Sequence, residues 1–128
     1  MIPVTPYPTE YRDPWIDEHG FLRFQIGMKR PSLVKITEIF RHAGELTADG
    51  PRRLIIDGRA MRIAPPAKAW TLATYRLGSI ATAVAFLFSD MSPVEVWKYQ
   101  KGIGMMMIPT RVFEEESDAV AWLQSFND

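Results

Sequence analysis

Four charged side chains are the strongest candidates for chemistry in this sequence. Asp57 ends one apolar stretch, and Asp90 follows a second, longer one. If these stretches are parallel strands of one sheet, both carboxylates lie at its carboxyl edge, where open α/β sheets bind their ligands. Arg59 and Arg62 lie in the loop after Asp57 and are suited to binding an anion. The alternative, which we favour, is that the aspartates cap turns and the arginines are solvated.

A run of three methionines, Met105, Met106 and Met107, is the second candidate. Methionine side chains are flexible and polarisable, so a cluster of them can line an adaptable apolar surface for a partner or a lipid-like ligand. The aromatic residues Trp97 and Tyr99 precede the run and would extend such a surface. The more ordinary interpretation, which we favour slightly, is that these side chains fill the core under a loop.

Familiar catalytic and metal-binding patterns are absent from the sequence. It contains no cysteine, which excludes disulfides, thiol catalysis and cysteine-ligated metals. Gly102-Ile-Gly104 lacks the third glycine of a phosphate-binding loop, and there is no Gly-x-Ser-x-Gly motif. His19 and His42 have no metal-ligand spacing to other residues. We therefore expect no enzymatic activity, no cofactor and no metal ion.

The two apolar stretches are predicted to be strands that are joined by a helix. Residues 53–57 form the first strand, and a helix follows over about residues 66–77, ended by Gly78. Its inward stripe consists of Trp70, Ala73 and Leu77. Residues 81–88 are apolar on both faces, which is typical of a central parallel strand. Strand, helix and strand in this order predict a βαβ unit.

The segment before this unit is predicted to contain a hairpin and a helix. Residues 15–27 form the hairpin, with Gly20 at the turn. Its second strand alternates, and the apolar face consists of Leu22, Phe24 and Ile26. Ser32 can cap the helix that follows. The stripe of that helix consists of Leu33, Ile36, Phe40 and Ala43.

The segment after the unit is predicted to contain a helix, a strand and a last helix. Ser92 and Pro93 are a typical helix start, and this helix is expected to reach about Lys101. Residues 110–113 are a short strand candidate. Residues 114–118 place negative charge at the start of the last helix, where it suits the helix dipole.

Size and charge indicate one globular domain. The chain has 128 residues with 15 basic and 15 acidic side chains, so its formal net charge is zero. A neutral chain lacks the electrostatic attraction that nucleic acids and anionic membranes require. Residues 81–88 are far shorter than the ~18 apolar residues of a spanning helix, and the sequence shows no secretion signal. A cytoplasmic location is the expectation.

The first 14 residues contain four prolines and are predicted to be an extended arm, followed by the domain at residues 15–128. Such an arm is either loose or lies across a partner subunit. We favour the loose arm, because chain termini are often poorly ordered.

From residue 15 onward the chain resembles the SpoIIAA-like group of the STAS superfamily. The most specific part is the ending, in which a short strand finishing in Phe113 runs into an acidic helix start and then Ala119-Val-Ala-Trp-Leu123. The strand ending in Asp57-Gly58 is a weaker part of the pattern. The resemblance implies an α/β fold with a mixed sheet of four to five strands and helices packed against it. It also implies a non-enzymatic role and frequent self-association, as a homodimer. Related folds include lipid-binding domains.

One departure from that pattern concerns regulation. Anti-sigma-factor antagonists of this superfamily carry a phosphorylated serine at the start of the helix after the aspartate-bearing strand. Here no serine or threonine lies between Gly58 and Trp70. We therefore expect no phosphoserine switch.

Three hypotheses follow for the function. The first is a protein-interaction or regulatory module that binds a protein partner or itself. The second is a binding module for a small apolar or lipid-like ligand near the methionine run. The third, which we favour least, is an enzyme that uses Asp57, Asp90 and Arg62.

Overall fold

One mixed β-sheet organises the structure, which is a computed structural model that describes residues 7–61, 67–89 and 92–126. The strands lie side by side in chain order; only β1 and β2 are antiparallel, and every later neighbour is parallel. The strands are β1 (Arg12–Ile16), β2 (Leu22–Gln25), β3 (Arg52–Asp57), β4 (Ala81–Leu87) and β5 (Thr110–Phe113). The helices of the described residues are α1 (Leu33–Leu46), α2 (Ala67–Ile80), α3 (Pro93–Ile103) and α4 (Glu116–Gln124). The predicted α/β class and mixed sheet are confirmed.

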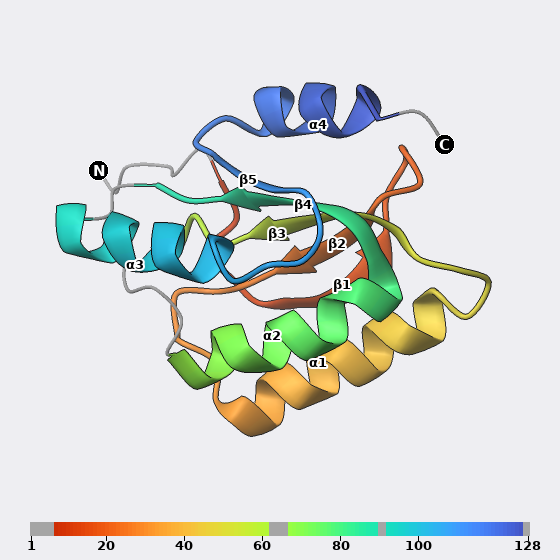
Figure 1. The fold of residues 1–128 in the computed structure, drawn as a ribbon, viewed down its shortest axis with the longest axis horizontal. Helices are drawn as coiled ribbons and strands as arrows, with labels where there is room; N and C mark the ends of the chain where they lie inside the picture. The colour runs from red at the N-terminus through yellow and green to blue at the C-terminus, as the bar shows by residue number, and fades with distance from the viewer. Residues whose placement is uncertain (1–6, 62–66, 90–91, 127–128) are drawn as a thin grey trace.

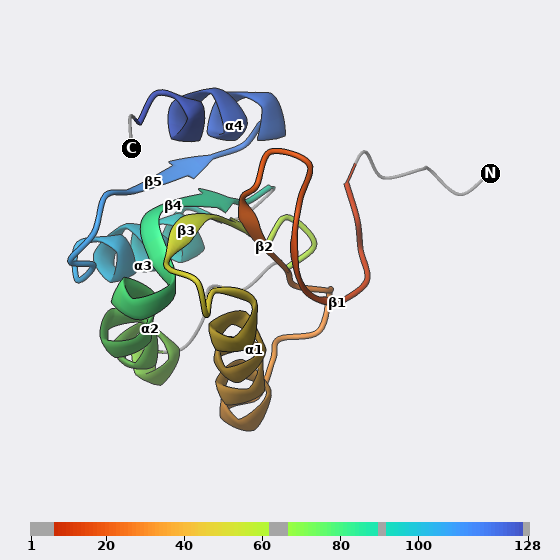
Figure 2. The same ribbon diagram turned by 90° about the vertical axis from the view of Figure 1, so that its right-hand side faces the viewer.

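Helices cover both faces of the sheet. Figures 1 and 2 show α1 and α2 side by side on one face and α4 on the opposite face. α1 and α2 start at the same end of the molecule, the end at which β3 and β4 finish (Figure 1). This follows from the parallel strands, because each helix carries the chain back across the sheet to the start of the next strand.

The two central strands separate two apolar clusters. Leu54 and Val84 belong to the cluster beneath α1 and α2, whereas Ile55 and Ala85 belong to the cluster beneath α4. All four side chains are fully buried. Successive side chains of a strand point to opposite faces, so the part of a strand that is covered on both sides is apolar at successive positions. The prediction of a buried, parallel strand after residue 80 is confirmed.

The predicted hairpin is formed by β1 and β2. Gly20 lies in the turn with φ +79°, a conformation that glycine adopts without strain. β1 begins at Arg12, inside the segment that was predicted to be an extended arm, and it contains Pro14. Proline is tolerated there because β1 is an edge strand, and the register shifts between Arg12 and Trp15.

Both predicted serine caps are confirmed. The hydroxyl of Ser32 accepts a hydrogen bond from the backbone amide of Lys35 at 3.1 Å, and that of Ser92 accepts one from Glu95 at 3.3 Å. Each serine thereby satisfies one of the amides that a helix start leaves unpaired. The proline pair at residues 65 and 66, which was predicted to open the middle helix, lies outside the described residues.

The predicted end of the middle helix was wrong. α2 continues through Gly78 to Ile80 and passes into β4 at the next residue. Leu77 and Ile80 are 1% and 4% exposed. Burying two aliphatic side chains stabilises the last turn by more than the roughly 1 kcal/mol that a glycine costs in a helix. α3 likewise includes Gly102 and ends at Ile103, two residues beyond the predicted end.

Candidate functional site

The Asp57 carboxylate is engaged within its own turn. Its side chain is 3% exposed. One carboxylate oxygen accepts hydrogen bonds from the backbone amide of Arg59 at 3.2 Å and from Arg59 Nε at 3.0 Å. The other oxygen accepts from Arg59 Nη2 at 2.8 Å. This paired contact is the strongest geometry for a guanidinium and a carboxylate, and it raises the pKa of Arg59.

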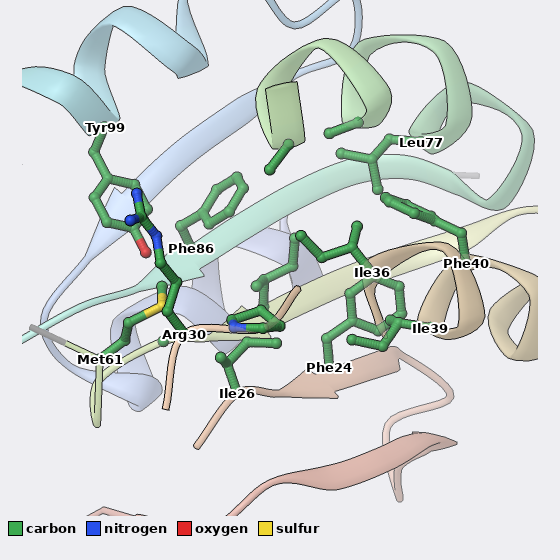
Figure 3. Close-up of a pocket in the computed structure, with 15 residues that line it drawn as sticks. Phe24, Ile26, Arg30, Ile36, Ile39, Phe40, Met61, Leu77, Phe86 and Tyr99 are labelled. Atoms are coloured by element: carbon green, nitrogen blue, oxygen red, sulfur yellow. The ribbon is translucent and has the colours of Figure 1, made fainter. Parts of the chain in front are cut away.

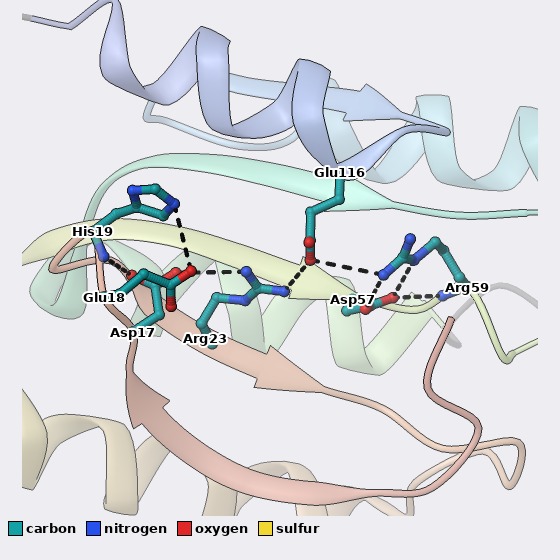
Figure 4. A network of polar contacts seen from close by, with 7 residues as sticks. All are labelled: Asp17, Glu18, His19, Arg23, Asp57, Arg59 and Glu116. Carbon is teal, nitrogen blue, oxygen red and sulfur yellow. Dashed lines mark hydrogen bonds and ion pairs between the residues drawn. The ribbon is translucent and has the colours of Figure 1, made fainter. Parts of the chain in front are cut away.

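A chain of charges extends from this pair across the sheet (Figure 4). Glu116, in the first turn of α4, lies 3.8 Å from Arg59 and 2.5 Å from Arg23 of β2. Arg23 also lies 3.5 Å from Asp17, which accepts backbone hydrogen bonds from His19 and Phe21 in the hairpin turn. The chain therefore ties the hairpin, α4 and the loop after β3 together.

This arrangement is suited to holding elements together. Arg23 is 11% exposed, and both oxygens of Asp57 already accept hydrogen bonds. A general base needs a carboxylate that can reach a substrate proton, and Asp57 lacks that freedom here. The other two residues of the catalytic hypothesis, Arg62 and Asp90, lie outside the described residues. Within the described ranges, no three histidine, aspartate or glutamate side chains cluster closely enough to hold a metal ion.

A pocket opens on the opposite face of the sheet, between α1, α2 and the strands (Figure 3). Its volume is about 90 Å³, and apolar atoms form nearly all of its wall. The sheet and the segments after its strands contribute Phe24, Ile26, Ile56, Gly58, Met61 and Phe86. The helices contribute Ile36, Ile39, Phe40, Ala69, Ala73, Leu77 and Tyr99, and Arg30 and Pro31 lie at the start of α1.

Tyr99 of α3 closes one end of this pocket. Its side chain is buried, and its ring contacts Phe86 and Phe88 with centroid distances of 5.8 and 6.1 Å. A Cβ atom at Gly58 would lie only 3.0 Å from the Tyr99 hydroxyl oxygen, so glycine leaves room for the ring. Burial raises the pKa of Tyr99 well above its usual value, and the negative charges of Asp57 and Glu95 raise it further.

The raised pKa of Tyr99 predicts a loss of stability at alkaline pH. The unfolded chain releases this proton near pH 10, whereas the folded chain keeps it. The contribution of Tyr99 to the free energy of unfolding is therefore retained below pH 10 and falls above it, by up to about 1.4 kcal/mol per pH unit, until the folded state also ionises. Urea unfolding between pH 8 and 11.5 measures the slope, which Tyr99→Phe should reduce. An unchanged slope in Tyr99→Phe would contradict the assignment, and Tyr75→Phe on the exposed side of α2 is the matched control.

None of the three methionines of the run lines the pocket. Met105 and Met107 follow the end of α3 and are 46% and 86% exposed. Met106 packs against the apolar cluster beneath α1 and α2. The pocket contains a different methionine, Met61, from the loop after β3.

Sequence reasoning missed Arg23, Glu116 and Arg30 as residues of interest. The alternation of β2 placed Arg23 on the polar face of a half-buried strand, but α4 covers that face as well. An arginine between Phe21 and Gln25 gives no local sign of a partner 93 residues away in sequence. The apolar stripes that form the walls of the pocket were predicted as core residues. The space that remains between them was not predicted.

Comparison with known proteins assigns no family to the chain. No protein-family model matches it, and no curated protein matches it significantly. Among solved structures, it is similar to the crystal structure of a protein with unknown function from Arthrobacter sp. FB24. The two share 22% sequence identity over 86% of this chain and 90% of that chain, with a TM-score of 0.31. A likeness at this level says nothing about a site or an activity.

The lengths and apolar content of the helices bear on whether the chain could span a membrane. None of those in the described residues is both long enough and apolar enough to cross a bilayer.

Proposed function

We propose that this chain is a non-catalytic domain of the SpoIIAA-like type that binds a small, largely apolar ligand between α1, α2 and the sheet. The observation that supports the proposal is the apolar pocket of about 90 Å³. It lies near the ends of β3 and β4, and ligands of open α/β sheets bind beyond the carboxyl ends of the strands. The ligand hypothesis drawn from the sequence is thus kept, with the binding site moved from the methionine run to this pocket.

The chemistry of the wall favours an apolar ligand over water. A buried water needs two to four polar partners, and among the described residues of this wall only Tyr99 and Arg30 have polar side chains. A ligand whose apolar part fills the space removes apolar surface of both the ligand and the wall from water, which stabilises the complex.

The competing explanation is a packing defect with no ligand. The two explanations can be separated by a substitution that fills the pocket with a larger side chain of the protein itself. Ala73 lies in the wall on α2 and is only partly buried, so a larger side chain there can reach into the pocket. Ala73→Phe should abolish ligand binding. Arg76→Phe, which adds the same ring on the exposed side of α2, should leave binding unchanged.

The experiment is native mass spectrometry of freshly purified protein, followed by NMR titration with 1-hexanol. We expect an apolar molecule to co-purify, or 1-hexanol to shift the methyl signals of Ile36 and Met61 in the pocket. Both effects should vanish in Ala73→Phe and persist in Arg76→Phe. Absence of any bound molecule together with no shift at these methyl groups would refute the proposal.

Self-association is the second candidate function, and the exposed face of α3 favours it. Val94 and Trp97 are 61% and 56% exposed and lie three residues apart, on the same side of the helix. Met105 and Met107 are also exposed in the segment just after the helix. We propose a second copy of the chain as the occupant, because a net charge of zero removes the repulsion between identical copies.

Sedimentation velocity over a range of protein concentrations tests this second candidate. Trp97→Glu should shift the population to monomer, because it places a charge in the apolar contact. Val34→Glu makes the same kind of change at an exposed apolar residue of α1 and should not. A wild-type protein that stays monomeric at all concentrations would rule this function out.

A further inference from the structure

We infer that two copies of this chain associate through the free edge of β5, as antiparallel strands that join the two sheets into one. The inference rests on the self-association proposed above, because it names the strand through which the copies meet. Met105 and Met107, which are exposed, lie in the segment between α3 and β5. The exposed apolar residues named above therefore lead directly into this edge.

The first support is the contrast between the two edges of the sheet. β1 forms one edge and β5 forms the other (Figure 2). β1 contains Pro14, which has no N–H to donate, and its register shifts between Arg12 and Trp15. Both features protect an edge strand from pairing with another chain. β5 contains no proline and keeps a continuous register with β4, so it is the edge that can accept another strand.

The second support is the direction of the backbone groups of β5. The carbonyls of Pro109 and Phe113 accept hydrogen bonds from β4 at 2.9 and 3.1 Å. Backbone groups of successive strand residues point to opposite sides of the strand, so those of Thr110 and Val112 point to the free edge. A second copy that runs antiparallel, with the two Val112 residues opposite each other, can exchange both backbone hydrogen bonds of this residue.

The third support is the distribution of charge along the strand. Arg111 is exposed in β5, and Glu114 and Glu115 are exposed directly after it. Antiparallel pairing places the basic part of one strand beside the acidic end of the other, and two-fold symmetry makes this contact twice. With the two Val112 residues opposite each other, the long side chain of Arg111 can reach Glu115 of the second copy. The edge is thus complementary in charge to itself.

Single cysteines test the pairing directly, because the chain has no cysteine of its own. In the inferred register the two Val112 Cα atoms lie about 5.5 Å apart, which suits a disulfide. Val112→Cys should therefore form a covalent dimer on mild oxidation of dilute protein. Thr110→Cys is the matched control, because Thr110 lies opposite Glu114 of the second copy and its own two copies are about 13 Å apart.

Charge reversal tests the complementarity of the edge. In sedimentation velocity at low ionic strength, Arg111→Glu and Glu115→Arg should each weaken dimerisation about tenfold, because each brings like charges together. An equimolar mixture of the two variants should recover dimers, because each acidic position then meets a basic one. Arg41→Glu reverses an exposed charge on α1 instead and should leave dimerisation unchanged. Glu115 makes no side-chain cap hydrogen bond, so its replacement removes none from the start of α4.

The outcomes separate this interface from self-association in general. Covalent dimers of Val112→Cys but not of Thr110→Cys, with recovery of dimers in the mixture, would support the inference. If Val112→Cys cross-links no better than Thr110→Cys, or if the charge variants dimerise like the wild type, the β5 edge is rejected. A wild-type dimer would then leave the exposed face of α3 as the interface, which Trp97→Glu tests. If the wild type stays monomeric and neither cysteine cross-links, both the inference and self-association fail.

Discussion

Asp57→Asn is expected to lower the free energy of unfolding by about 3 kcal/mol, the low end of the range for breaking a buried ion pair. The side chains of Asp57 and Arg59 are 3% and 12% exposed, so solvent screens the pair poorly. Asparagine keeps the shape of the side chain and can still accept the backbone hydrogen bond of Arg59. The loss therefore reports the charge that Arg59 retains without its partner. Urea unfolding at pH 7 measures it.

A matched control separates burial from charge in this experiment. Glu45→Gln removes one charge from the Arg41–Glu45 pair of α1, whose side chains are 67% and 65% exposed. Exposed pairs of this spacing contribute only about 0.3–0.5 kcal/mol. The double variant Asp57→Asn with Arg59→Gln should recover part of the loss, because it also removes the guanidinium charge that the substitution of Asp57 leaves less well compensated. Equal effects of Asp57→Asn and Glu45→Gln would show that the pair is not buried in solution.

Leu54→Ala and Ile55→Ala are each expected to lower the free energy of unfolding by about 3 kcal/mol, although these adjacent residues pack in different clusters. Both side chains are fully buried in β3. Truncating a buried leucine or isoleucine loses transfer energy and leaves a cavity, which together cost about 2–5 kcal/mol. Thr82→Ala, at an exposed position of β4, should change stability by no more than about 0.5 kcal/mol.

NMR chemical shifts distinguish the two faces of the sheet. Leu54→Ala should shift the signals of Phe40 and Phe86, which share its cluster beneath α1 and α2. Ile55→Ala should shift those of Ala119 and Leu123 of α4 instead. If one of the two substitutions leaves the free energy of unfolding unchanged, the face of the sheet to which that side chain points is not packed as described.

Most of the fold could be predicted because local patterns and packing agree. Strict alternation in β2, a continuous apolar run in β4 and the serine caps of α1 and α3 each determine an element without reference to distant residues. The prediction failed at Gly78, where the burial of Leu77 and Ile80 outweighs the local preference of glycine for a helix end. Tertiary burial of that kind cannot be seen in a window of a few residues.

The site was harder to predict than the fold for two physical reasons. The pairing of Asp57 with its own turn follows from a short sequence separation, and the sequence did indicate turn capping. The partnership of Arg23 with Glu116 depends on which face of the sheet α4 covers. The pocket depends on the volumes of side chains from several elements, and space left between them has no sequence pattern.

The direct passage of α2 into β4 has a mechanical consequence. No residue separates Ile80 at the end of the helix from Ala81 at the start of the strand. α2 therefore cannot slide along its axis without pulling a strand that is paired on both sides. Any movement of the wall that α2 forms is therefore anchored at this junction. The amplitude of any opening is then greatest where the helix begins, at the end of the pocket that Arg30 flanks.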